Sequence, residues 1–142
     1  MAEETQELEN TETTADELMG YRPIREIVKD LTKPIAPKHL RKRRQGGKEI
    51  TYLAWYDATK YLDYFAPGWN YEITRIDSIA GKLILTVRIS IPCLEGIVYR
   101  EATGQEDETL ESYGDSSSNA ESMALRRAAA KFGLGIGLYS QN

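Results

Sequence analysis

One stretch of ten residues constrains the fold more than any other part of the chain. From Lys82 to Ile91, apolar side chains occupy every second position. These side chains are Leu83, Leu85, Val87, Ile89 and Ile91. Strict alternation over this length is typical of a β-strand that buries one face. Turn residues precede it at Ala80-Gly81 and Pro92 ends it, so the sequence predicts a half-buried strand over residues 82–91.

Two flanking segments alternate in the same way. Residues 69–76 precede the turn at Ala80-Gly81, and residues 96–104 follow Pro92. Each connection is short, and short connections join antiparallel neighbours because a parallel crossover needs a dozen residues or more. We therefore expect a three-stranded antiparallel sheet in which the first strand is half-buried.

Helical patterns lie on both sides of the predicted sheet. Apolar residues at helical spacing follow Pro23 and predict a short helix that ends before Pro34. Tyr52 to Phe65 form an aromatic-rich amphipathic pattern, closed by Pro67-Gly68, that predicts a second helix. The region between these two helices, residues 33–48, is rich in basic residues, Pro and Gly. We expect it to be a basic, partly mobile loop.

The last predicted helix has the clearest start. Ser118 and Glu121 have the spacing of a capping box, in which the Ser side chain accepts from a backbone amide and the Glu reaches back. The helix runs from Asn119 to about Phe132, and Gly133 is suited to end it in a left-handed conformation. The order of elements predicts an α+β fold, with a helix, a three-stranded antiparallel sheet and a closing helix packed on one side.

Charge is strongly segregated along the chain. The net charge is −4, yet residues 1–20 hold seven acidic side chains and no basic one. Residues 22–48 hold ten Lys or Arg against two acidic residues. Such segregation is expected of a chain with a charged polymer as its partner, or with an internal competitor for one. We divide the chain into a disordered acidic tail (1–20), a short helix and basic loop (21–48), and a main domain (49–142).

No pattern indicates an enzyme. The single histidine, His39, lies in the basic loop, so neither a His-metal cluster nor a Ser–His pair is supported. The acidic group Glu106-Asp107-Glu108 with Glu111 lacks the spacing of a calcium loop. We expect no catalytic site, no metal and no cofactor. The only cysteine, Cys93, suits a buried position in a reducing compartment, so we expect a cytoplasmic protein, and a chain with DNA as its charged partner would be nucleoid-associated.

Basic residues near the C-terminus are the clearest binding candidates. Arg126, Arg127 and Lys131 are the only charged residues after Glu121. Arg127 and Lys131 are four residues apart and share a helix face. The alanines at 128–130 leave the cations unobstructed and would let a backbone come close. Two interpretations are open, a face that attracts phosphates without reading bases, or a solvated basic edge stabilised by the helix dipole.

A second candidate is the run Arg41-Lys42-Arg43-Arg44, followed by Lys48. Such a run is typical of a nuclear-localisation signal or a general polyanion patch, and it would also make salt-sensitive contacts in a DNA groove. Eight aromatic residues lie between positions 52 and 71. Their helical and strand spacing places most of them in the core, although exposed ones would be able to stack on bases.

Three segments together resemble the Rad-fifty-two family of annealing proteins and its DNA-damage-response protein A relatives. The segments are Tyr52–Lys60, Phe65–Trp69 and Ala120–Gly135. In that family a Tyr-rich helix ends in Gly-Trp, three strands follow, and a closing helix carries a basic pair, an Ala-rich turn and Phe-Gly. The third segment is the most specific, because Leu-Arg-Arg-Ala followed by Phe-Gly is uncommon by chance. The likeness covers about residues 48–139.

The resemblance implies a homo-oligomeric ring or filament that binds single-stranded DNA and anneals homologous strands in recombination and double-strand break repair, without ATP. Arg126 and Arg127 match the family's basic pair, whereas Lys131 is offset by one residue from a further basic position. A basic groove residue of the family falls near Asp57, so Lys60 is the candidate replacement. The candidate DNA contacts are Arg126, Arg127, Lys131, Lys60, Arg41, Lys42, Arg43, Arg44 and Lys48. Single-strand-binding proteins and recombinases are the candidate protein partners.

Oligomers are also expected on physical grounds, because the open edges of a three-stranded sheet invite pairing with another chain. Two other classes of function stay open. One is a protein-interaction or assembly module that uses the basic loop and the acidic tail. The other is an enzyme with an acidic site at residues 106–111, whose activity a chelator would abolish.

The acidic tail generates a first prediction. If its seven carboxylates compete with DNA for the basic loop, deletion of residues 1–20 tightens DNA binding at low salt, and the gain disappears at high salt because exposed charges are screened. Fluorescence anisotropy with a labelled oligonucleotide measures both affinities. Unchanged affinity after deletion would leave the tail a solubilising role only.

Overall fold

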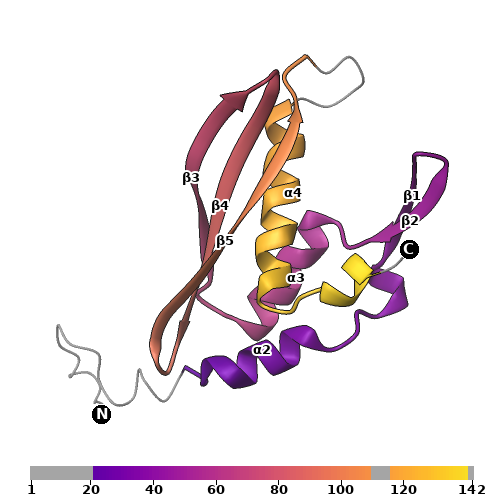
Figure 1. The fold of residues 1–142 in the computed structure, drawn as a ribbon. Coiled ribbons are helices and arrows are strands. Elements are labelled where there is room, and N and C mark those ends of the chain that lie inside the picture. The colour runs from indigo at the N-terminus through magenta and orange to yellow at the C-terminus, as the bar shows by residue number, and fades with distance from the viewer. Residues whose placement is uncertain (1–20, 110–115, 141–142) are drawn as a thin grey trace, which may run out of the picture.

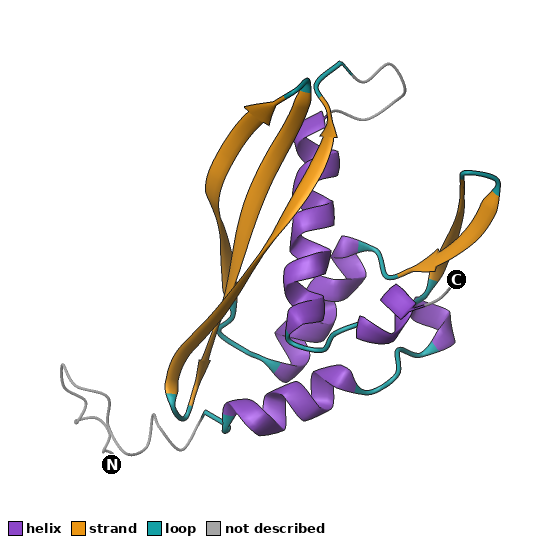
Figure 2. Cartoon of the chain, viewed as in Figure 1, coloured by secondary structure: helices purple, strands orange, loops and turns teal. Residues whose placement is uncertain are grey.

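The computed structural model describes residues 21–109 and 116–140, and it confirms the α+β fold (Figures 1 and 2). The tail at residues 1–20, which we expected to be disordered, lies outside the described residues. The helices are α2 (Ile24–Thr32), α3 (Trp55–Phe65) and α4 (Ser116–Lys131), with 3-10 turns η1 (Pro37–His39) and η2 (Ile136–Ser140). The strands are β1 (Arg41–Gln45), β2 (Lys48–Tyr52), β3 (Asn70–Ile79), β4 (Lys82–Cys93) and β5 (Gly96–Asp107).

The predicted strand over residues 82–91 is the centre of the main sheet. The strand order is β3-β4-β5, and both pairs are antiparallel. Leu85, Val87, Ile89 and Ile91 of β4 are buried on the face that α4 covers. Figure 1 shows α4 lying along the β4–β5 half of the sheet. The alternation in the sequence therefore identified both the strand and its buried face.

Close approach of β5 to α4 depends on small residues. At Gly104 a Cβ atom would lie 2.0 Å from the carbonyl oxygen of Ala120 and 2.6 Å from the amide nitrogen of Ala124. Ala120 and Ala124 are both fully buried, so the helix backbone sits directly on the strand. The alanines at 128–130 are buried as well. The backbone that comes close to this Ala-rich helix, at Ala120 and Ala124, is thus the protein's own β5.

The end of α4 is the one expected from Gly133. The Gly133 amide donates to the Ala130 carbonyl at 2.8 Å, and the Leu134 amide donates to the Ala129 carbonyl at 3.1 Å. These two bonds form a Schellman motif, with Gly133 at a φ of 107°. The predicted capping box is wrong. The helix already begins at Ser116, so Ser118 lies inside its first turn, and Glu121 accepts from the Tyr71 hydroxyl at 2.8 Å.

Strand β3 differs from its expected half-buried state. Its side chains are exposed at all positions but Asp77, because α4 covers β4 and β5 and leaves β3 as an overhanging edge. The register shifts between Ile73 and Arg75, so Ile73 pairs with Val87 while Ile76 pairs with Leu85. This β-bulge places both isoleucines on the helix side of the sheet, at 40% and 64% exposure.

The segment expected to be a basic loop is largely a β-hairpin. Residues 41–45 pair with residues 48–52, and Gly46 and Gly47 occupy the turn with φ values of 60° and 78°. Positive φ at both positions is the requirement of a type I′ hairpin turn, and Gly-Gly is a recognised signal for it. Tyr52 consequently ends β2, and the second helix begins three residues later, at Trp55.

Helices α2 and α3 close the core below α4. Ile27 and Leu31 of α2 join Leu62 of α3 and Phe132 in one hydrophobic cluster with the buried face of β4. The boundary that we drew between residues 48 and 49 falls within the hairpin. In the parts of the chain that the structure describes, no helix is long and apolar enough to cross a membrane.

The contact between β5 and α4 yields a prediction on stability. Gly104→Ala should lower the free energy of unfolding by about 2 kcal/mol or more, because the new methyl group meets backbone atoms that cannot rotate away. Chemical denaturation measures the change. Gly137→Ala is the matched control, since a Cβ there meets no atom within 4 Å, and it should alter stability by less than about 0.5 kcal/mol. Equal stability of the two variants would contradict the proposed close packing.

Candidate nucleic-acid interface

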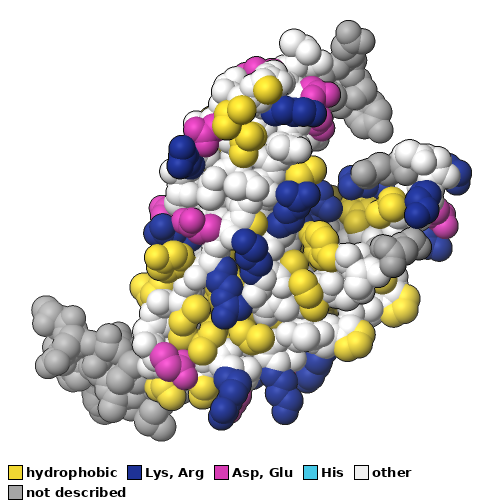
Figure 3. Space-filling model, viewed as in Figure 1, with side chains coloured by type: hydrophobic (Ala, Val, Ile, Leu, Met, Phe, Trp, Pro, Cys, Tyr) yellow, Lys and Arg dark blue, Asp and Glu magenta, His cyan; other side chains and the backbone are white. Residues whose placement is uncertain are grey.

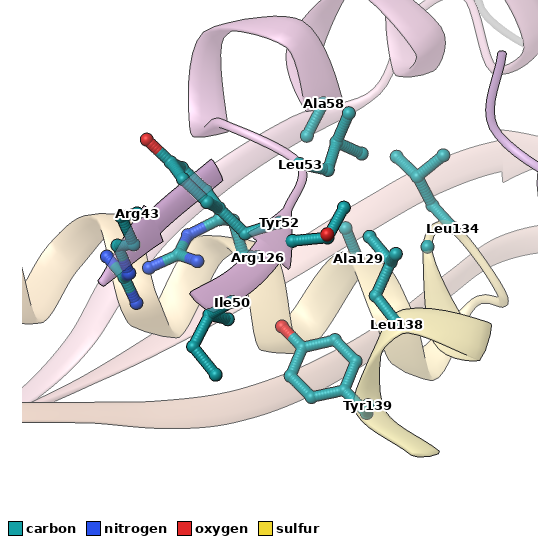
Figure 4. Close-up of a pocket in the computed structure, with 12 residues that line it drawn as sticks. Arg43, Ile50, Tyr52, Leu53, Ala58, Arg126, Ala129, Leu134, Leu138 and Tyr139 are labelled. Carbon is teal, nitrogen blue, oxygen red and sulfur yellow. The ribbon is translucent and has the colours of Figure 1, made fainter. Parts of the chain in front are cut away.

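A cavity of about 270 Å³ lies between the β1–β2 hairpin, α4 and η2 (Figure 4). Arg43 of the hairpin and Arg126 of α4 supply its cations, and Tyr52 and Tyr139 supply its rings. Leu53, Leu134 and Leu138 form an apolar floor. Segments that are more than seventy residues apart in the sequence therefore build one site.

The two arginines share one aromatic ring. The guanidinium carbon of Arg43 lies 4.8 Å from the centroid of the Tyr52 ring, and that of Arg126 lies 5.8 Å from it. Each contact is a cation–π interaction. Among residues 21–109 and 116–140, neither arginine forms an ion pair with a carboxylate. Two neighbouring cations that lack a carboxylate favour a bound anion.

Arg126 is the most constrained cation of the site. It is half-buried, and its Nε donates to the Ser122 carbonyl at 3.2 Å. Burial lowers the pKa of Arg126 below its ordinary value, and the positive charges of Arg43 and Arg127 act in the same direction. Arginine nevertheless stays charged at neutral pH. An anion between these groups would offset both the burial and the repulsion.

Arg127 and Lys131 continue the basic surface along α4. Both line a second, more open hollow next to β5, and Tyr139 borders this hollow as well as the cavity. Arg127 donates to the Thr103 carbonyl at 3.1 Å, and Lys131 donates to the Glu101 carbonyl at 2.6 Å. Neither forms an ion pair within the described ranges. Figure 3 shows a broken row of Lys and Arg side chains across this side of the molecule.

We call this surface the basic groove and define it by Arg43, Arg126, Arg127 and Lys131, with Tyr52 and Tyr139. Strand alternation divides the hairpin cations around it. Arg43 lines the cavity, whereas Lys42 and Arg44, its neighbours on the strand, point to the opposite face. Lys48 pairs with Gln45 near the hairpin tip, and Arg44 donates to the Gly47 carbonyl at 2.9 Å. The structure thus brings one residue of the basic run to the α4 cations.

The remaining two candidates meet at Asp57 instead. Arg41 donates from Nε to the Asp57 carboxylate at 3.1 Å, and Lys60 Nζ lies 3.9 Å from the same carboxylate. This hydrogen bond raises the pKa of Arg41 above its ordinary value. Arg41 and Lys60 line neither hollow of the basic groove. A role for Lys60 in place of a basic residue at position 57 stays a prediction.

Comparison with known proteins places this chain in a family. Residues 23–142 match the Rad52/22 family of double-strand break repair proteins. The chain belongs to this family. It is 33% identical over 123 residues to DNA repair RAD52-like protein 1, mitochondrial, of Arabidopsis thaliana, covering 85% of this chain and 70% of that protein. It is also 33% identical over 124 residues to the chloroplastic RAD52-like protein 2 of that plant, covering 84% of this chain and 62% of the relative.

Membership in the Rad52/22 family gives the chain a role in DNA repair and recombination. The matched range includes the hairpin, α4 and η2, so every residue of the basic groove lies within the family domain. The resemblance that the Tyr52, Trp69 and Phe132 motifs indicated is therefore confirmed.

Two residues of the basic groove, Tyr52 and Tyr139, are not among the candidate DNA contacts predicted from the sequence. Tyr52 was assigned to a helix, although it ends β2 and contacts both arginines. Tyr139 was not singled out, although it borders both hollows. The Gly46-Gly47 turn signal followed by Ile50 and Thr51 would have predicted the hairpin, and with it the position of Tyr52. No sequence signal identifies Tyr139.

The acidic group near the end of β5 is used internally. Lys82 pairs with Asp107 at 2.7 Å, and Ser78 and Asn119 bond to Glu108 and Glu106. Glu111 lies outside the described residues. Within residues 21–109 and 116–140, no group of three His, Cys, Asp or Glu is arranged to hold a metal ion.

Proposed function

We propose that this Rad52/22-family chain binds single-stranded DNA along the basic groove and anneals homologous strands in recombination and double-strand break repair. It acts without ATP and without a catalytic site of its own, and it works in association with the nucleoid. The observation that carries the proposal is the set of four cations, from β1 and α4, that no described carboxylate neutralises.

The groove is suited to phosphates and not to the reading of bases. Guanidinium and ammonium groups bind phosphate oxygens in any sequence, so they position a strand without selecting it. Tyr52 is occupied by two guanidinium groups, which leaves Tyr139 as the groove ring that is free of a cation–π contact among the described residues. Strands held by their phosphates keep their base edges available for pairing, which is what annealing requires.

The proposed assembly is a ring or filament of copies of this chain. The β3 edge carries exposed Ile73 and Ile76 on the helix side of the sheet, beyond the part that α4 covers. Exposed edge strands with apolar side chains favour pairing with another chain. A second copy on this edge would bury both isoleucines and bring the next basic groove alongside. Single-strand-binding proteins and recombinases are the partners that we propose for such an assembly.

The first experiment measures DNA binding by fluorescence anisotropy, with a labelled single strand and its duplex at several salt concentrations. Arg126→Ala/Arg127→Ala should weaken single-strand binding by about a hundredfold or more, because charge-assisted hydrogen bonds contribute about 1.5–3 kcal/mol each and the variant removes two of the cations that would form them. The slope of log affinity against log salt should fall by about 1.4, since each phosphate contact on a single strand contributes about 0.7.

Arg25→Ala/Lys29→Ala is the matched control. Both residues are exposed on α2, line neither hollow of the groove and carry the same total charge. This variant should keep most of the affinity of the wild type. Equal losses in the two variants would mean that net charge alone governs binding, and weak binding by the wild type would favour the interaction-module alternative.

Solution size tests the assembly. Light scattering coupled to gel filtration should show a large oligomer for the wild type, and Ile73→Asp/Ile76→Asp should reduce its size because charges would be buried at the new edge contact. Ile97→Asp is the control, since Ile97 is 72% exposed on the opposite face of the sheet. A wild-type monomer would overturn the proposed assembly.

A further inference from the structure

One buried carboxylate stands out from the polar residues of the described chain. Asp57, in the first turn of α3, is 5% exposed and is the only buried polar or charged residue in the parts of the chain that the structure describes. A buried charge is tolerated only when it is paired. The partners of this carboxylate are Arg41, at 3.1 Å, and Lys60, at 3.9 Å. The helix N-terminus also favours a negative charge at this position.

The pair ties the β1–β2 hairpin to α3. Arg41 is the first residue of β1 and pairs with Tyr52 at the base of the hairpin. Its guanidinium lies 5.0 Å from the centroid of the Tyr56 ring as well as bonding to Asp57. The two strands of the hairpin form a sheet of their own, and an isolated two-stranded hairpin is marginally stable in water. Its position therefore depends on side-chain anchors such as this one.

The position of the hairpin sets the geometry of the basic groove. Arg43 lies two residues after Arg41 and projects from the same face of β1. It reaches Arg126 through the shared Tyr52 ring, and Tyr52 is itself the strand partner of Arg41. If the base of the hairpin moves away from α3, Arg43 and Tyr52 both move away from α4.

We propose that Asp57 is a positioning residue of the basic groove. Its buried carboxylate holds the hairpin on α3 through Arg41, so that Arg43 stays opposite Arg126. The DNA affinity gained from this positioning is larger than the affinity lost because the Asp57 charge repels phosphates. The inference rests on the proposed binding of single-stranded DNA.

The sign of one mutational effect separates positioning from simple electrostatics. Asp57→Asn removes a negative charge close to Arg41 and Lys60 and leaves both free to contact phosphates. If electrostatics alone governed the affinity, Asp57→Asn would therefore bind DNA more tightly than the wild type. If Asp57 positions the hairpin, Asp57→Asn binds DNA more weakly, because the neutral amide holds the Arg41 guanidinium less strongly than a carboxylate does.

The test uses the full chain and a labelled single-stranded oligonucleotide. We expect Asp57→Asn to weaken binding by about tenfold, which corresponds to the loss of one charge-assisted phosphate contact, and to lower the salt slope by about 0.7. Hydrogen exchange of amides 41–52 should become faster while that of β4 and α4 is unchanged. A general loss of stability would speed exchange throughout and leave the salt slope of the folded molecules unaltered.

Asp63→Asn is the matched control on the same helix. Asp63 is exposed and accepts from the Trp69 indole at 2.6 Å, a bond that an asparagine oxygen still accepts. The charge change equals that of Asp57→Asn, so affinity should stay equal to that of the wild type or rise slightly. Equal or tighter binding by Asp57→Asn, with unchanged exchange of the hairpin, would overturn the proposal.

A second variant covers the case in which Asp57→Asn folds poorly. Arg41→Lys keeps the net charge but removes the planar fork that bonds to Asp57 and stacks on Tyr56. It should weaken binding to a similar extent, and the double variant should be no weaker than either single one. Wild-type affinity in Arg41→Lys would contradict the proposal. If the wild type binds no single strand, the proposed function fails, whereas faster hairpin exchange would still confirm the anchor.

Discussion

The close packing of α4 on β4 and β5 is the contact on which the rest of the structure depends. A glycine in β5 and two alanines in α4 let the strand and helix backbones meet directly, and the buried face of β4 fills the space beside them. Because the small residues of α4 face the sheet, Arg127 and Lys131 lie on the flank of the helix next to β5, where both donate to carbonyls of that strand. The packing of α4 on these two strands thus determines both the core and the orientation of the cations.

The β1–β2 hairpin, which forms the other side of the basic groove, is held less firmly than α4. The hairpin contributes Arg43 and Tyr52, yet it forms its own two-stranded sheet and adds no strand to the main one. Its attachment relies on side chains, among them a buried carboxylate with an arginine partner. The carboxylate is buried and the arginine is half exposed, so the pair adds little net stability, but separating it would leave a buried charge without this partner. Such a pair is therefore better suited to fixing a position than to stabilising the fold.

The distribution of charge connects this architecture to DNA repair. Cations elsewhere in the described chain are often paired with carboxylates, as Arg88 is with Glu101 and Lys82 with Asp107. The cations of the basic groove lie close to one another instead, and burial together with the repulsion from Arg43 and Arg127 lowers the pKa of Arg126. Repulsion of this kind is relieved when a polyanion binds, and membership in the Rad52/22 family of double-strand break repair proteins is the reason that we propose DNA as this polyanion.

The sequence by itself determined the central strand, the closing helix with its Gly133 terminator, the α+β class and the family, because each is encoded in local periodicity or in a contiguous motif. It also identified Arg126 and Arg127 as the basic pair. Only the tertiary structure decided that Arg43, and neither Lys42 nor Arg44, joins that pair, and that Asp57 is buried against Arg41. These facts depend on strand register and on contacts between segments far apart in the chain. Local patterns carry no information about contacts between distant segments. The sequence therefore predicted a uniform basic loop, whereas in the structure this run is a strand whose alternate side chains lie on opposite faces.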